Sequence, residues 1–216
     1  MRIGIIDYGM GNLFSVEQAI KRLGYEVLVS ADKEELFATD ALILPGVGSF
    51  KDAMKRLQET NLDSLINEIE ISNKPLLGIC LGMQLLFQRS TENGSGKGLG
   101  IFKGEIERFA GINDDGIAYR VPHMGWNELQ FAQHPEWLQE NEMTGDHFVY
   151  FVHSYFATNI DQEELVAFAH YGNELVPGIV QRGSITGMQF HPEKSSEFGV
   201  LLLRLWLDGV KKGVVM

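Results

Sequence analysis

The chain has 216 residues, of which 44% are hydrophobic and 22% are charged, values typical of globular proteins and outside the range of disordered chains. Its length suits one α/β domain, so we expect residues 1–216 to form a single domain. The formal net charge of −11 repels phosphate backbones and anionic lipid surfaces, which disfavours nucleic acid and membranes as partners.

The N-terminal segment and the cysteine content exclude further classes. The run MRIGIIDYG meets an acid after a short apolar stretch, so it is neither a signal peptide nor a membrane span, and we expect a cytoplasmic protein. Cys80 is the single cysteine, which rules out an internal disulfide. No group of cysteines and histidines has the spacing of a zinc site, and we expect neither a metal nor a cofactor.

Short apolar runs alternate with helical patterns in the first part of the chain. Runs too short for buried helices predict four strands, at 2–7, 26–29, 41–44 and 75–79. Apolar spacing and glycine stops predict helices at 16–23 and from about Leu81, and one or two helices within 49–73. This alternation is typical of an α/β fold in which helices cover both faces of a mixed, largely parallel central sheet.

From about Leu99 the pattern changes to strands that are separated by turns. Five strands are predicted, at 101–109, 147–156, 165–170, 178–181 and 185–190. Because short turns join strands that run in opposite directions, we expect an antiparallel portion in this half of the chain. A final helix is indicated by apolar residues at helical spacing, Phe198, Leu201, Leu202, Leu205 and Trp206.

Two glycine-rich segments resemble nucleotide-binding motifs only in part. Gly9 and Gly11 follow the first strand as in a dinucleotide fingerprint, but Phe14 stands where the third glycine is required. The stretch GSGKGLG at 94–100 lacks the first glycine and the final Ser or Thr of a phosphate loop. We interpret it as a flexible surface loop.

Cys80 lies within Gly-Ile-Cys-Leu-Gly, at the predicted junction between a buried strand and a helix. This is the pattern of a nucleophile elbow, a tight turn in which small flanking residues relieve crowding and the nucleophile projects at the carboxyl edge of the sheet. The positive end of the following helix would favour a thiolate. The alternative is a small buried hydrophobic residue, the role of most lone cysteines.

The tripeptide His191-Pro192-Glu193 follows another predicted strand. A histidine at a strand end can take the proton of a thiol and later give a proton to a leaving amine. Glu193 is placed to orient the imidazole and to stabilise its protonated form, as the acid does in Ser-His-Asp sites. In isolation, a capping histidine and a solvated acid would explain the same residues.

The segment Pro45-Gly46-Val47-Gly48-Ser49-Phe50 also follows a predicted buried strand. Its glycines allow the backbone to approach a substrate closely, so the N–H of Val47 can join that of Leu81 in an oxyanion hole. Taken alone, the segment is an ordinary glycine turn.

Together these motifs carry a specific resemblance. PGVGSF, GICLGMQLLF and GMQFHPEKS, in this order and at these intervals, resemble the class I, triad-type glutamine amidotransferases over nearly the whole chain. The resemblance implies a flavodoxin-like fold and hydrolysis of the side-chain amide of L-glutamine through a thioester on Cys80, with His191 and Glu193 completing the triad. It also implies that Gly48, Gln84 and the backbone around Ser154 and Tyr155 bind the substrate.

Three further segments are similar to one branch of this family. They are IGIIDYGMGNLFSV at 3–16, PHMGWN at 122–127 and YFVHSY at 150–155. The resemblance implies a heterodimer in histidine biosynthesis, in which a separate (βα)8-barrel cyclase subunit receives ammonia through a tunnel. It implies low glutaminase activity in the isolated chain and places five residues at or near the partner surface, Met10, Asn12, Trp126, Tyr150 and Lys194.

Other functions compete with this interpretation. A non-catalytic binding protein could keep the fold, although the intact triad argues against it. A cysteine peptidase or thiol hydrolase would use a similar elbow. Within the family, glutaminases that serve anthranilate, pyridoxal phosphate or GMP synthesis are the nearest alternatives.

Overall fold

The computed structural model describes residues 1–139, 143 and 145–215, and it has an eight-stranded mixed sheet at its centre. The strand order is β2-β1-β3-β4-β14-β13-β12-β9. The five strands from β2 to β14 are parallel, and the remaining pairings are antiparallel. This confirms the predicted mixed sheet with an antiparallel portion in the second half of the chain. The strands are β1 Arg2–Ile6, β2 Glu26–Ser30, β3 Ala41–Leu44, β4 Leu76–Ile79, β9 Gln130–Phe131, β12 Leu165–Tyr171, β13 Glu174–Arg182 and β14 Ile185–Met188.

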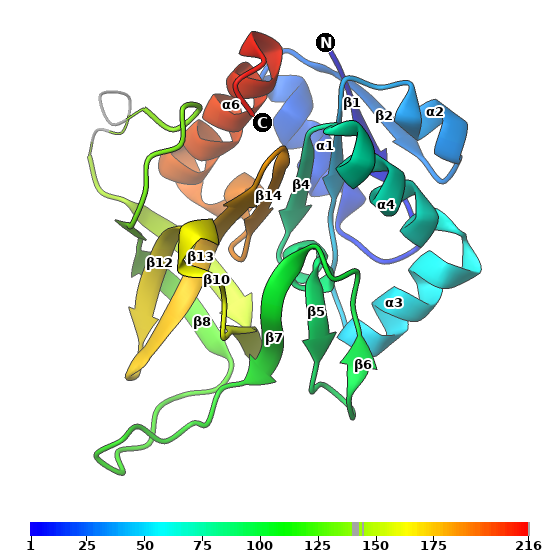
Figure 1. Cartoon of the computed structure of the whole chain (residues 1–216). Coiled ribbons are helices and arrows are strands. Elements are labelled where there is room, and N and C mark those ends of the chain that lie inside the picture. Colours follow the sequence, from blue (N-terminus) through cyan, green and yellow to red (C-terminus); the bar gives the residue numbers. More distant parts are fainter. Residues whose placement is uncertain (140–142, 144, 216) are drawn as a thin grey trace.

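Helices cover both faces of the parallel strands, with α1 and α6 on one side and α2, α3 and α4 on the other (Figure 1). The bounds are α1 Leu13–Arg22, α2 Lys33–Phe37, α3 Phe50–Glu59, α4 Leu62–Ser72, α5 Leu81–Leu85 and α6 Ser196–Lys212. Alternate residues of the strands explain the two layers, since Ile43 packs in the core beneath α1 and α6, whereas Leu42 and Leu44 pack beneath α3 and α4. The segment 49–73 is therefore two helices, one of the two arrangements that its pattern allowed.

Two smaller sheets extend the antiparallel half of the chain. One pairs β8 His123–Glu128 with β10 Phe148–His153, and the other has the order β11-β7-β5-β6. The latter contains β5 Phe87–Ser90, β6 Gly96–Lys97, β7 Phe102–Arg108 and β11 Tyr155–Thr158. The predicted strand 147–156 is wrong as one element, because Ser154 divides it between the two sheets. The predicted loop 94–100 is also wrong in part, because its residues 96–97 pair with β5.

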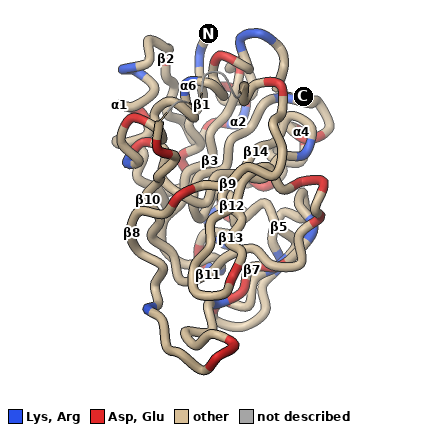
Figure 2. The backbone as a smooth tube through the Cα atoms, turned by 90° about the vertical axis from the view of Figure 1, so that its left-hand side faces the viewer, with Lys and Arg blue, Asp and Glu red and all other residues tan. Residues whose placement is uncertain are grey.

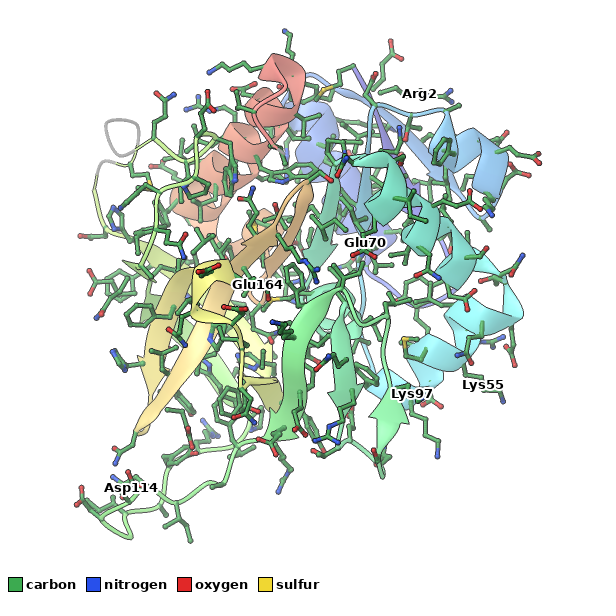
Figure 3. The ribbon with its side chains drawn as sticks, viewed as in Figure 1. Arg2, Lys55, Glu70, Lys97, Asp114 and Glu164 are labelled. Atoms are coloured by element: carbon green, nitrogen blue, oxygen red, sulfur yellow. The ribbon has the colours of Figure 1, made fainter. Side chains whose placement is uncertain are left out.

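Basic and acidic positions are interspersed in the view of Figure 2, whereas the central strands β3, β4 and β14 contain no charged residue. The long connection between β7 and β8 projects from the body of the molecule and carries Asp114 at its far end (Figure 3). Within the described residues, no helix is long and apolar enough to cross a membrane. The residues that the structure describes also include the 3-10 turns η2 Gln162–Glu164 and η3 Pro192–Lys194.

Candidate active site

Cys80 occupies the sharp turn between β4 and α5. Its backbone has φ 54° and ψ −113°, a conformation that is strained for a residue with a side chain. The Cys80 N–H donates to the carbonyl of Met188 on the neighbouring strand β14, at 2.8 Å, which holds the turn against the sheet. The side chain is largely buried. The predicted elbow is therefore present, and the strain is located at the residue that the sequence singled out.

The glycines on either side of Cys80 are required by crowding. A Cβ at Gly82 would lie 1.8 Å from the carbonyl oxygen of Leu44, and one at Gly78 would lie 2.9 Å from backbone atoms of Gly82 and Met83. Both distances are too short for any side chain. The turn can form only with hydrogen at these positions, as the pattern predicted.

Helix α5 is shorter than the sequence suggests. It spans five residues, Leu81–Leu85, and passes directly into β5. A helix of little more than one turn has a weak dipole, so the predicted contribution of a helix end to the thiolate is small.

His191 provides the main charged neighbour of Cys80. It follows β14 and begins the η3 turn, and its Nδ1 lies 2.9 Å from Oε1 of Glu193. Burial disfavours the charged ring, but hydrogen bonds to Cys80 and Glu193 outweigh it and raise the pKa of His191 from its ordinary value of 6.5 to about 10. The ring is therefore protonated at neutral pH and faces the cysteine as an imidazolium.

Glu193 lies behind His191 rather than in the cavity. Its side chain is 1% exposed, and its second oxygen, Oε2, has no hydrogen-bond partner among the described residues. A buried carboxylate with one partner acts strongly on that partner, because little water screens it. This geometry suits an orienting acid, and the predicted capping histidine and solvated acid are both excluded by burial.

The glycine segment after β3 packs directly against the elbow. A Cβ at Gly46 would lie 2.8 Å from the nitrogen of Gly82 and 2.9 Å from Cβ of Leu81, so the two segments are in close contact. Gly48 has φ +99°, which favours glycine. The hydroxyl of buried Tyr8 donates to the carbonyl of Pro45 at 2.9 Å and holds the start of the segment.

These segments enclose a cavity of about 440 Å³. Nine of the residues singled out from the sequence line it, namely Val47, Gly48, Cys80, Leu81, Gln84, Ser154, Tyr155, His191 and Lys194. They come from four separate parts of the chain, 47–48, 80–84, 154–155 and 191–194. The structure thus brings together the predicted nucleophile, base, oxyanion segment and substrate residues, with Glu193 in contact behind the base.

Gln84 is held by two hydrogen bonds at the wall of this cavity. Its Nε2 donates to the carbonyl of Tyr155 at 2.9 Å and to Oε1 of Gln189 at 3.0 Å. Both amide protons are therefore used within the protein. Only the carbonyl oxygen of Gln84 remains to contact a ligand. Because Gln84 is buried and both its amide protons are bonded, it is not a plain polar residue of the helix.

Several residues at the site were not predicted. Glu92, Pro122, Val152 and His153 also line the cavity, and Gln189 places its Nε2 4.0 Å from Sγ of Cys80. Gln189 and His153 lie inside motifs already noted, so their strand-end position was a usable signal. Glu92 gave no signal, because it lies in a turn beyond β5 and reaches back to accept from the N–H of Phe50.

Of the residues predicted at a partner surface, Lys194 lines the cavity, and Met10 and Tyr150 contact residues that line it. Trp126 and Tyr150 face each other across β8 and β10 with ring centroids 5.9 Å apart, and Trp126 is half exposed, which excludes core packing for it. Met10 reaches Gly48 with its methyl group. Asn12 caps α1 by accepting from the N–H of Ser15. The described residues contain no cluster of metal-binding side chains.

Comparisons with known proteins agree with this geometry. Residues 4–205 match the family described as "Glutamine amidotransferase class-I". Proteins named "Imidazole glycerol phosphate synthase subunit HisH" from Geobacillus sp. (strain WCH70) and Halalkalibacterium halodurans are each 52% identical, over 94% and 98% of both chains. A crystal structure titled "Crystal structure of glutamine amidotransferase" is similar in fold, with a TM-score of 0.72, 23% identity and coverage of 97% of this chain and 98% of that one.

Proposed function

The chain belongs to the class I glutamine amidotransferase family, and from this premise we propose that Cys80 hydrolyses glutamine and that a second subunit consumes the ammonia. It is a glutamine amidotransferase, the glutaminase subunit of imidazole glycerol phosphate synthase in histidine biosynthesis. This corresponds to the branch that the segments IGIIDYGMGNLFSV, PHMGWN and YFVHSY indicated. We also propose that residues 1–216 act as one domain and that the protein works in the cytoplasm.

The observation that carries the chemistry is the chain of contacts from Cys80 through His191 to Glu193, at one wall of the cavity. The thiolate attacks the carboxamide carbon of glutamine, and the oxygen of the tetrahedral intermediate lies against the N–H groups of Val47 and Leu81. His191 gives its proton to the departing ammonia, which leaves a thioester on Cys80. It then takes a proton from the water that hydrolyses the thioester to glutamate.

The remaining cavity residues match the two ends of glutamine. Glu92 is the acidic side chain that lines the cavity, and we assign it to the α-ammonium group of the substrate. The backbone around Ser154 and Tyr155 holds the α-carboxylate, and Gly48 lies against the substrate chain. The free carbonyl oxygen of Gln84 is an acceptor for the substrate's nitrogen.

A partner subunit would account for the five residues that the sequence predicted at a partner surface. The related proteins are named as subunits, and we assign to this chain, as its partner, a cyclase subunit with a (βα)8-barrel fold. Met10, Asn12, Trp126, Tyr150 and Lys194 form the contact surface or its approach. Since ammonia in water is mostly protonated near neutral pH, enclosure between the subunits keeps it nucleophilic until it reacts.

The test combines labelling and kinetics. A glutamine analogue with an electrophilic carbon is expected to add to Cys80, and mass spectrometry locates the adduct; an unlabelled Cys80 would refute the assignment. Cys80→Ser is the matched control. Addition of the cyclase subunit should raise glutamine hydrolysis strongly, because docking aligns the donor at Val47. Equal rates with and without that subunit would disprove the activation.

A further inference from the structure

Two buried histidines, His153 in the wall of the substrate cavity and His123 next to it, have no role in the chemistry above. His123 begins β8 and His153 ends β10, and the two residues are direct partners in the antiparallel register. His123 is fully buried and His153 is 7% exposed. The Nδ1 atom of His123 lies 3.0 Å from Nε2 of His153, so the two rings are hydrogen-bonded to each other.

The outer nitrogen of each ring meets an oxygen that can only accept. His153 Nδ1 lies 2.8 Å from the carbonyl oxygen of Tyr155. His123 Nε2 lies 2.9 Å from Oδ1 of Asn127. The orientation of the Asn127 amide is fixed by its other end, where Nδ2 donates to the carbonyl of His170 at 3.2 Å. Both outer ring nitrogens must therefore carry protons.

These contacts determine the number of protons on the pair. Each of the three contacts requires one proton between its two atoms. The contacts are Tyr155 to His153, His153 to His123, and His123 to Asn127. Two neutral histidines have only two ring protons, so any neutral arrangement leaves two lone pairs facing each other. Two charged histidines have four, which places two N–H groups in opposition. Only three protons, one shared between the rings, satisfy all contacts.

The surroundings set the cost of this single charge. Burial lowers the pKa of both rings, and that of His153 to about 3, with His123 and the charged His191 acting in the same direction. The two lone pairs that would face each other in a neutral pair oppose this effect and favour retention of one proton between the rings. The ring of Tyr171 stacks on His123 with centroids 3.9 Å apart, and Phe151 covers its other face. Aromatic faces stabilise a cation, and the two oxygens at the ends of the pair add to this. His191 and Tyr171 are the titratable side chains that face the pair.

The pair holds the backbone that lines the substrate cavity. The carbonyl of Tyr155 accepts from His153 and from Gln84, so both of its lone pairs are used and its peptide plane is fixed. Gln84 also donates to Oε1 of Gln189, and Nε2 of Gln189 lies 4.0 Å from Sγ of Cys80. At the other end, Asn127 follows Trp126 on the strand that carries the exposed tryptophan. The histidines are thus the central link between that strand and the cavity wall.

We propose that His123 and His153 are positioning residues for glutamine, which share one proton and through it hold the substrate-binding turn at Ser154 and Tyr155. The assignment of a turn that binds glutamine rests on the proposed function. The proton count does not, because it follows from the contacts alone. The two parts therefore have separate tests.

The proton count is tested by nitrogen NMR on the full chain with labelled histidine. Three of the four ring nitrogens of the pair are expected to be protonated near neutral pH, and one proton should couple to both rings. Asn127→Leu is the matched variant: it removes the outer acceptor of His123, so a neutral pair satisfies the remaining contacts and the count should fall to two. Two protons in the wild type, or no change in the variant, would overturn the proposal.

The positioning role is tested by kinetics in complex with the cyclase subunit. Asn127→Leu and His123→Phe, which keeps the aromatic stack, should each raise KM for glutamine about tenfold and change kcat by less than about threefold, the effect of one weakened hydrogen-bond link. The KM of the wild type should rise with pH as the shared proton is lost, whereas that of Asn127→Leu should not. Parallel pH profiles would refute a positioning proton. If the wild-type complex does not hydrolyse glutamine but the count is three, the proposed function fails and the proton assignment stands.

Discussion

Tyr8→Phe is expected to loosen the oxyanion segment, residues 45–50, while the rest of the fold is retained. The Tyr8 hydroxyl is buried and donates to the carbonyl of Pro45, at the first residue of that segment. Burial, together with the charge of Cys80, raises the pKa of Tyr8, so the phenol remains a donor at every pH at which the protein functions. Its removal leaves a buried carbonyl without a partner and costs about 1–3 kcal/mol of unfolding free energy.

The catalytic effect depends on how far the released segment moves. If the N–H of Val47 leaves the oxyanion, one donor is lost, which typically costs about 3–4 kcal/mol of transition-state stabilisation, or 10²–10³ in kcat. We therefore expect Tyr8→Phe to lower kcat far more than its loss of stability explains. The kcat is measured in glutaminase assays with saturating cyclase subunit, and the stability is measured by urea unfolding.

A matched control exists far from the site. The hydroxyl of Tyr25 donates to Asp208 on α6, so Tyr25→Phe removes a phenol hydrogen bond without touching the oxyanion segment. It should reduce stability and leave kcat unchanged. If the two variants lose similar stability and both retain kcat, the phenol does not position the segment, and the reasoning is refuted.

Three further predictions concern the triad, the elbow and the partner surface. Glu193→Gln should lower the pKa of His191, which Glu193 helps to raise to about 10, so the alkaline limb of the kcat/KM profile moves to lower pH. Gly82→Ala should lower the free energy of unfolding by more than about 3 kcal/mol, measured in urea. The added Cβ would clash with the backbone carbonyl of Leu44, which cannot move without distorting strand β3. Trp126→Ala should weaken binding of the cyclase subunit by about 2 kcal/mol in calorimetry, with unchanged stability, because the indole is half exposed.

Much of the fold and the triad could be predicted from sequence because each depends on a local signal. The buried strand before Cys80 is a continuous apolar run, and the flanking glycines are required by contacts within their own turn and the adjacent strand. His191 and Glu193 are two residues apart, so their contact needs no knowledge of the rest of the chain. Local patterns of this kind are the ones that a single sequence carries.

The features that were missed depend on partners that are distant in sequence. The run 147–156 has an unbroken strand pattern, but Phe148–His153 pairs with β8 while Tyr155–Thr158 pairs with β7, and the pattern carries no information about this change of partner. Glu92 accepts a hydrogen bond from the backbone N–H of Phe50, which lies 42 residues earlier in the chain. The polar pair of His123 and His153 likewise forms only when β8 and β10 are in register.

Strand order explains why three segments far apart in the chain form one site. Val47 follows β3, Cys80 follows β4 and His191 follows β14, and these strands are adjacent and parallel in the order β3-β4-β14. Their carboxyl ends therefore meet at one edge, with the nucleophile in the middle. Adjacent strands are about 4.8 Å apart, so one further strand between β4 and β14 would place the base roughly 10 Å from the nucleophile's strand, beyond hydrogen-bond reach. The insertion of the second, antiparallel half of the chain beyond β14, rather than within the parallel strands, is what keeps the triad in contact.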